Sequence, residues 1–169
     1  MIRNMGRALM LDVDFYSHLA RTPVLFWQAA AVVTFANMFA GIGSSIATGS
    51  DPLVGGAVGV ATGVSGWVVW SGVAYLVGVR VFGGDTSYRA MLRVVGFAYA
   101  PLTFGVVPWL GFVGAAWALL AAVVAIHESM AFSTRRSFAT MAPGWVVWLG
   151  LAVGINVALG WDFFSTWRV

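Results

Sequence analysis

Histidine and glutamate at positions 127 and 128 are the adjacent residues best suited to acid–base or metal chemistry. They stand in the sequence HESMA, in which a zinc protease would carry a second histidine at position 131. Ala131 occupies that position. A single histidine at the end of an apolar run is usually interfacial, so His127 is only a weak candidate ligand for haem or a chlorin. We predict no catalytic residue, no metal ligand and no cofactor, and therefore no enzyme.

Acidic residues that could relay protons are few, and they stand near the ends of the apolar runs. An ion-coupled transporter needs such groups partway through the membrane. The six acids are Asp12, Asp14, Asp51, Asp85, Glu128 and Asp162. We expect Glu128 to pair with an arginine on the same side of the membrane. The chain has no cysteine, which excludes disulfides, thiol catalysis and thiolate metal sites.

Four arginines are the candidate contact residues. Arg89 and Arg93 are four residues apart and share a face of a helix, and Arg135 and Arg136 stand in a polar stretch. Their apolar stems can lie along a membrane protein while the guanidinium groups bind lipid phosphates or a partner's carboxylates. Because the net charge is only +3 and the arginines are dispersed, we predict no nucleic-acid partner.

Composition determines which elements must position these residues. Apolar residues make up 60% of the chain, charged residues only 9%, and the mean hydropathy is +0.89, which indicates an integral membrane protein. A span needs about 20 helical residues. The run from Met91 to Phe132 would reach roughly 60 Å as one helix, so it must turn near Pro108 to Gly111. We predict an all-α, polytopic protein with five transmembrane helices, over residues 24–47, 53–79, 91–108, 111–130 and 144–161.

The distribution of arginine predicts the orientation, since short positively charged loops stay in the cytoplasm. With five spans and a cytoplasmic N-terminus, only Arg168 falls outside. The chain uses arginine without lysine and is rich in alanine, valine, glycine and tryptophan, which is typical of GC-rich bacterial genomes. We therefore predict a multi-pass protein of the bacterial inner membrane with its C-terminus periplasmic or outside.

Residues 1–23 are predicted to be a cytoplasmic amphipathic segment ahead of the transmembrane domain at 24–169. On a helix its apolar residues form one stripe, which suits an interfacial helix on the membrane surface. A packed cytoplasmic cap is the alternative. The stripe consists of Met1, Met5, Ala8, Leu11, Phe15 and Leu19.

Small residues and prolines predict how the helices end and pack. Asp51 and Pro52 suit an N-cap and a first helical position, and Asp85 or Thr86 suits the cap of the third span. Pro101 removes a backbone N–H and is expected to kink that span, as a structural bend or as part of a gate. Glycines at four-residue spacing predict helix-packing faces, within the bundle or between chains. They are Gly55, Gly59 and Gly63 in the second span, and Gly150 and Gly154 in the fifth.

Three blocks along the chain together resemble bacterial Yip domain proteins. They are LMLDVDFY with the later AGIGSS, then GGDTSYRAMLRVVGFAYAP, then AIHESMAFSTRRSFATMAPGW. The resemblance implies five spans, a cytoplasmic N-terminus and a very short external C-terminus. Eukaryotic members bind Rab or Ypt GTPases in vesicle traffic, partly through a longer N-terminal region with an Asp-Leu-Tyr-Gly-Pro motif. That motif is absent here, so GTPase binding is not carried over.

The predicted function is a non-enzymatic membrane scaffold or accessory subunit. Its expected partners are other integral membrane proteins, further copies of itself, and anionic phospholipids. The alternative is a small transporter or channel that uses the kinked third span.

Overall fold

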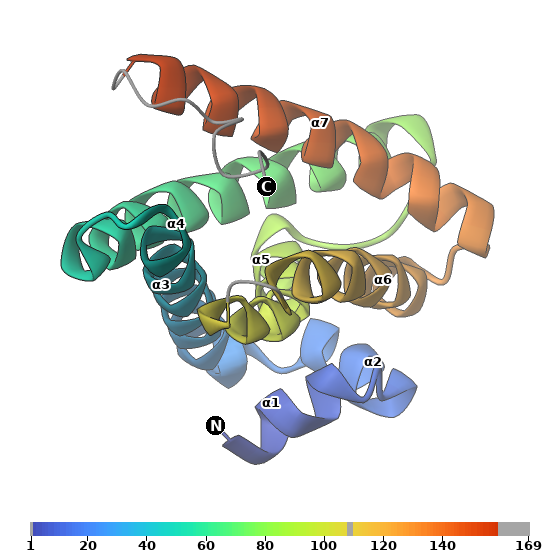
Figure 1. Ribbon diagram of the computed structural model, residues 1–169. Helices are drawn as coiled ribbons and strands as arrows, with labels where there is room; N and C mark the ends of the chain where they lie inside the picture. Colours follow the sequence, from blue (N-terminus) through green and yellow to red (C-terminus); the bar gives the residue numbers. More distant parts are fainter. Residues whose placement is uncertain (1, 108–109, 159–169) are drawn as a thin grey trace.

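The computed structural model describes residues 2–107 and 110–158, and all of its regular elements in these ranges are helical (Figure 1). The predicted all-α class is therefore confirmed for this part of the chain. The elements are α1 Ile2–Leu9, α2 Val13–Arg21, a short 3₁₀ turn η1 Pro23–Leu25, α3 Phe26–Thr48, α4 Pro52–Leu76, a π-helical turn η2 Val77–Val81, α5 Tyr88–Ala98, a 3₁₀ segment η3 Ala100–Val106, α6 Gly111–Met130 and α7 Thr134–Ala158.

Within the described residues, three helices are long and apolar enough to cross a bilayer. They run over Pro23–Thr48, Pro52–Val81 and Gly111–Met130, close to the first, second and fourth predicted spans. This supports an integral membrane protein with several apolar helices. The end of the fifth predicted span and the C-terminus lie outside the described residues.

The turn between α3 and α4 forms for the reasons that its sequence suggests. Gly49 ends α3 with a φ of 68°, a left-handed conformation that glycine adopts without strain. Asp51 then caps α4, because its Oδ1 accepts hydrogen bonds from the backbone N–H groups of Leu53 at 2.7 Å and Val54 at 3.4 Å. Pro52 takes the first helical position, where its missing N–H costs nothing. The predicted cap is confirmed.

Helix α5 is the centre of the bundle, and every residue from 90 to 101 is buried. It packs against α2, α3, α4 and α6. Its cap is Ser87, whose Oγ accepts from the N–H of Ala90 at 3.2 Å. The predicted cap at Asp85 or Thr86 is therefore wrong, because the extended loop continues to Ser87 before the helix begins.

Pro101 changes the type of helix where we predicted a kink in one continuous α-helix. Helix α5 ends at Ala98, and η3 begins at Ala100 with Pro101 in its first turn. In the interior of an α-helix, proline removes one backbone hydrogen bond and its ring clashes with the carbonyl four residues earlier. At the start of a new helical segment neither penalty arises, which explains why α5 ends before Pro101 and η3 begins there. The hydrogen bond from Leu102 N to Tyr99 O at 2.9 Å is part of this tighter winding.

The N-terminal segment is two helices, where the sequence suggested one. Leu11 has a φ of 54° and breaks the chain direction between α1 and α2. Asp12 then caps α2 by accepting from the N–H of Phe15 at 3.0 Å. A continuous helix was the wrong prediction, because the stripe of apolar residues does not reveal that Asp12 begins a new helix.

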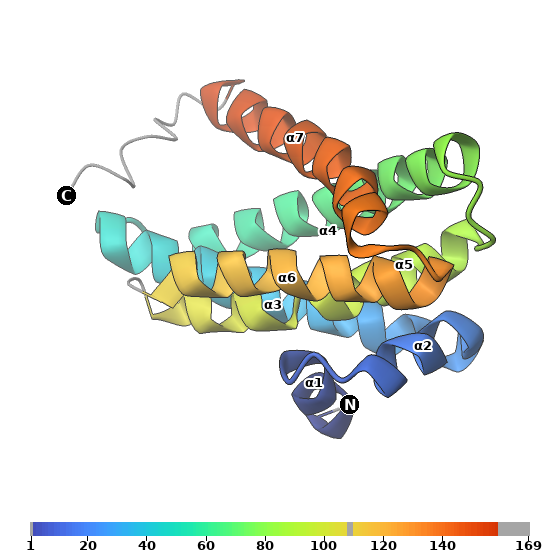
Figure 2. The ribbon, with the colours of Figure 1, turned by 90° about the vertical axis from the view of Figure 1, so that its right-hand side faces the viewer.

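The two N-terminal helices pack along one side of the bundle (Figure 2). Phe15 of α2 contacts Phe97 of α5 edge to face, with ring centroids 5.2 Å apart. The indole Nε1 of Trp117 on α6 donates to the carbonyl of Leu9 at 3.0 Å. The segment is thus joined to the bundle by packed side chains, which agrees with the packed-cap alternative more than with a helix lying free on the membrane surface.

Helix α7 begins at Thr134, inside the polar stretch that precedes the fifth predicted span. Ser137 and Thr140 are fully buried there, which their hydroxyls tolerate by donating to carbonyls of the same helix, at Ser133 (3.2 Å) and Arg136 (2.8 Å). Internal hydrogen bonding by Ser and Thr explains why a helix forms there and is buried.

Candidate functional site: the arginine-rich end of the bundle

One end of the bundle gathers most of the described arginines. The last turns of α2, α4 with η2, and α6 reach this end, and α5 and α7 start from it (Figure 2). The exposed arginines there are Arg21, Arg80, Arg89, Arg135 and Arg136. We call this set the arginine-rich end. At the opposite end, the turn between α3 and α4 carries only Asp51 as a charged residue.

Three of these arginines stand in the first turns of helices. Arg89 is the second residue of α5, and Arg135 and Arg136 are the second and third residues of α7. Free N–H groups make the start of a helix electropositive, so a cation there costs about 0.3–1 kcal/mol. An anion at this end would meet the guanidinium groups and the helix starts together. The arrangement is electrostatically suited to phosphate or carboxylate groups.

The structure gives Arg93 a different environment from the one predicted. Only 5% of it is exposed. Its Nε donates to the carbonyl of Leu19 at 3.0 Å, and its Nη2 donates to the carbonyl of Ala20 at 2.7 Å. These are carbonyls of the last turn of α2, where helices run short of internal donors. The Leu19 carbonyl also accepts from the N–H of Thr22 at 3.3 Å. Arg93 is therefore committed to joining α2 to α5, whereas Arg89 remains exposed.

His127 and Glu128 form a weak pair at the end of α6, with 3.7 Å between His127 Nε2 and Glu128 Oε1. Among the described residues, no arginine lies within ion-pair distance of the Glu128 carboxylate. The predicted Glu128–arginine pair is therefore wrong. Arg89, Arg135 and Arg136 are exposed at the starts of their helices. His127 Nδ1 is buried without a hydrogen-bond partner. Among the described residues there is no group of three or more possible metal ligands.

Two glycines hold the connections at this end close together. A Cβ at Gly84 would lie 2.7 Å from the ring of Phe132, and one at Gly78 would lie 2.5 Å from the sulfur of Met130. The N–H of Gly84 donates to the carbonyl of Gly78 at 2.9 Å, and Phe82 packs edge to face on Phe132. The segment between α6 and α7 is thus packed against the end of α4. This gives the arginines a rigid support.

The glycines predicted to pack in the second span lie against α3. A Cβ at Gly59 would overlap the backbone oxygen of Asn37, and one at Gly63 would overlap the Asn37 side chain. A Cβ at Gly55 would be 2.7 Å from the oxygen of Gly41. The structure therefore places this face inside the chain, between α3 and α4. The amide of Asn37 donates to Val33 of its own helix at 2.8 Å.

The glycines of the fifth span do not share this environment. A Cβ at Gly150 or Gly154 would meet no atom of the described residues within 4 Å, and both glycines are exposed. Helix α7 packs through its first half instead, where a Cβ at Gly144 would overlap the ring of Trp70. Farther along, α7 leads away from α4 (Figure 2). The four-residue spacing alone thus did not distinguish a packed glycine face from an open one.

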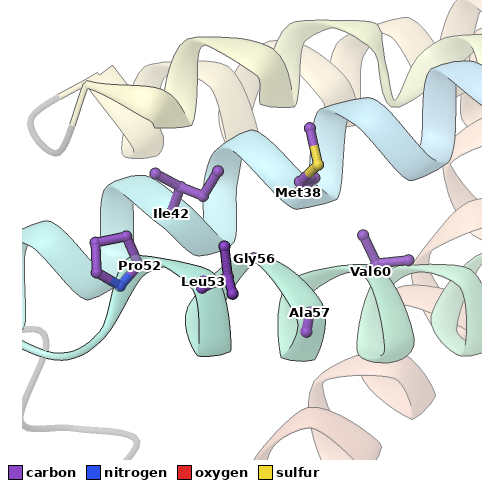
Figure 3. Close-up of a pocket in the computed structure, with 7 residues that line it drawn as sticks. All are labelled: Met38, Ile42, Pro52, Leu53, Gly56, Ala57 and Val60. Atoms are coloured by element: carbon purple, nitrogen blue, oxygen red, sulfur yellow. The ribbon is translucent and has the colours of Figure 1, made fainter.

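A shallow apolar groove of about 220 Å³ lies between α3 and α4 at the opposite end of the bundle (Figure 3). No charged residue lines it, so it offers shape to an apolar chain but no acid, base or ligand. Its lining residues are Met38, Ile42, Pro52, Leu53, Gly56, Ala57 and Val60.

Two buried tryptophans of α4 also position the core, and sequence reasoning missed them. Trp67 Nε1 donates to the carbonyl of Leu92 at 2.8 Å, and Trp70 Nε1 donates to the carbonyl of Met141 at 3.2 Å. They tie α4 to α5 and to α7. Their spacing of three residues places both tryptophans on one face of α4, and this spacing could have indicated that they pack in the core.

A comparison with models of protein families matches the Yip1 domain over residues 9–155. No curated protein and no solved structure is similar enough to this chain to be matched. The matched range begins in α1 and reaches almost to the end of α7, so it includes the central α5 and the whole arginine-rich end. The resemblance inferred from the three sequence blocks is thereby confirmed, and the chain belongs to the Yip1 domain family.

Proposed function

We propose that this Yip1-family membrane protein is a non-enzymatic scaffold or accessory subunit that associates with other membrane proteins and with anionic lipid. The observation that carries the proposal is the group of five exposed arginines at one end of a packed helical bundle. Three of them stand at helix starts, where an anionic headgroup or a partner's carboxylate would relieve the repulsion between like charges. An arginine near an anionic membrane surface contributes about 1 kcal/mol to binding.

We propose five spans in the bacterial inner membrane, with the arginine-rich end and the N-terminus in the cytoplasm. Helix α5, with 11 residues, is about 16 Å long, and η3, with 7 residues wound as a 3₁₀ helix, adds about 14 Å. Together they approach the roughly 30 Å of the hydrocarbon core. Because the 3₁₀ winding of η3 adds length, the segment made of α5 and η3 is long enough to be the third span, although α5 itself is short. Helix α7 supplies the fifth.

The orientation can be tested with single cysteines, since the natural chain has none. Ser50 and Ser133 are exposed at opposite ends of the bundle. We expect Ser50→Cys to react with a membrane-impermeant maleimide in intact cells, and Ser133→Cys to react only after the membrane is opened. The cysteine-free chain is the control for background labelling. The reverse pattern would contradict the proposed orientation.

Retention of anionic lipid tests the role of the arginines. We expect the Arg135→Gln/Arg136→Gln variant to lose affinity for phosphatidylglycerol by roughly thirtyfold, because two charge contacts of about 1 kcal/mol each are removed. The measurement is native mass spectrometry of protein released from nanodiscs with and without phosphatidylglycerol. Arg3→Gln, away from the arginine-rich end, is the control for a change in net charge. Equal retention by the double variant and the unchanged chain would rule out lipid binding at this end.

A further inference from the structure

Helix α7 is held in the bundle by its first half. Ser137, Thr140 and Met141 are buried there, and Trp70 Nε1 donates to the Met141 carbonyl at 3.2 Å. A Cβ at Gly78 of η2 would lie 3.2 Å from the Cγ2 of Thr140, so this half also packs closely on the end of α4. We call residues 134–142 the anchored half of α7.

The side chains that follow are much more exposed. Trp145 still packs partly against the core, but Val146 is 62% exposed and Val147 is 41% exposed. Gly150 and Gly154 are exposed as well. We call residues 146–158 the free half of α7, and Figure 2 shows that this half diverges from α4. One helix therefore has a half that is fixed in the bundle and a half that stands away from it.

The boundary between the two halves coincides with a proline inside the helix. Pro143 has no N–H group, so the carbonyl of Ala139 lacks its helical donor. Gly144 follows directly, and glycine restricts the backbone least of all residues. Sharp bends in helices occur mainly at proline and at a few other identifiable defects. Pro143 itself is exposed, so the packing of the core does not require a proline ring at this position.

Gly144 supplies a pivot beside the proline. A Cβ at Gly144 would overlap the ring of Trp70 and would lie 3.1 Å from the Trp70 carbonyl oxygen. The backbone of α7 thus lies directly against α4 at the point where its hydrogen bonding is weakest. A bend at this point moves the free half without separating the anchored half from Trp70.

We propose that Pro143 and Gly144 form a hinge, about which the free half of α7 moves toward and away from α4. Gly154 is 10 residues, or about 15 Å, beyond Gly144, so a bend of about 20° displaces it by about 5 Å. The two arginines of α7 belong to the anchored half and do not move with the hinge. The protein can therefore keep its arginine-rich end rigid while the distance between two of its helices changes at the other end. This device goes beyond the proposed function and does not depend on what the arginines bind.

Distances between pairs of spin labels test the hinge, since the natural chain has no cysteine that would react. Ser65→Cys/Gly154→Cys labels α4 and the free half, and Ser65→Cys/Phe138→Cys labels α4 and the anchored half. All three positions are exposed. By pulsed EPR in nanodiscs, we expect the distance distribution of the first pair to be broader than that of the second by about 5 Å. Equally narrow distributions for the two pairs would overturn the proposal.

Pro143→Ala then distinguishes a hinge at the proline from general motion of the helix end. Alanine restores the N–H that can bond to the carbonyl of Ala139, so the Ser65–Gly154 distribution should narrow to the width of the other pair. An unchanged Ser65–Phe138 distribution is expected to show that the variant keeps α7 packed. A Ser65–Gly154 distribution that stays broad in Pro143→Ala would contradict a hinge at this residue.

Failure of this inference can be separated from failure of the proposed function. Narrow distance distributions together with loss of phosphatidylglycerol in the Arg135→Gln/Arg136→Gln variant would reject the hinge and support the function of the arginine-rich end. A broad distribution that narrows in Pro143→Ala, together with unchanged lipid retention, would support the hinge and reject lipid binding.

Discussion

Replacement of Arg93 by methionine is expected to destabilise the protein by about 3 kcal/mol, the larger of the two stability effects that the structure predicts. Methionine keeps most of the length of the side chain but removes the donors to Leu19 and Ala20. A hydrogen bond that involves a charged group contributes about 1.5–3 kcal/mol, and the partly buried Ala20 carbonyl would lose its donor, which adds a further penalty. The measurement is unfolding in mixed micelles, followed by tryptophan fluorescence.

Arg89→Met is the matched control for this substitution. Arg89 stands four residues earlier on the same helix and is exposed, so its loss should change the free energy of unfolding by less than about 0.5 kcal/mol. Arg93→Lys should be intermediate, since one ammonium group keeps the charge but does not reproduce the geometry of the planar guanidinium. Equal effects of Arg89→Met and Arg93→Met would show that Arg93 does not hold α2.

The contrast between these two arginines shows where sequence reasoning reaches its limit. Spacing places Arg89 and Arg93 on one helix face, and that much is local geometry. Whether a guanidinium group meets lipid or protein depends on what lies beside it, and here that is the end of α2, more than seventy residues earlier in the chain. The apolar stripe of residues 1–23 does not reveal that a second helix begins at Asp12 and ends at Arg21, so the carbonyls that Arg93 contacts could not be predicted.

The parts of the fold that could be predicted are those determined by short segments. The length of apolar runs located α3, α4 and α6, because the thickness of a bilayer fixes how many helical residues a span needs. Asp51 and Pro52 marked the start of α4 through a cap that involves only neighbouring N–H groups. The end of α5 before Pro101 was misjudged, because a proline can bend a helix or end it, and tertiary packing decides between the two.

Gly59 lies on the glycine face of α4 that packs against α3. We expect Gly59→Ala to destabilise the protein by about 2 kcal/mol. The new methyl group would overlap the backbone oxygen of Asn37 and lie 3.0 Å from the Cα of Gly41. Both neighbours are backbone atoms, so α3 and α4 would have to separate along their contact instead of moving one side chain. Overpacking of this kind costs typically 1–3 kcal/mol, which outweighs the helix propensity gained by alanine.

Gly150→Ala tests the same substitution where the structure leaves room. In the part of the chain that the structure describes, no atom lies within 4 Å of a Cβ at Gly150. Only the gain in helix propensity should therefore remain, and the variant should be more stable by about 0.5–1 kcal/mol. Gly59 and Gly150 belong to the same spacing pattern. If Gly59→Ala lowers the free energy of unfolding and Gly150→Ala raises it, then contact with α3, and not the spacing pattern, makes a glycine necessary. A comparable loss of stability in Gly150→Ala would instead mean that a partner covers α7 in the membrane, since helix packing there would then need the same close approach.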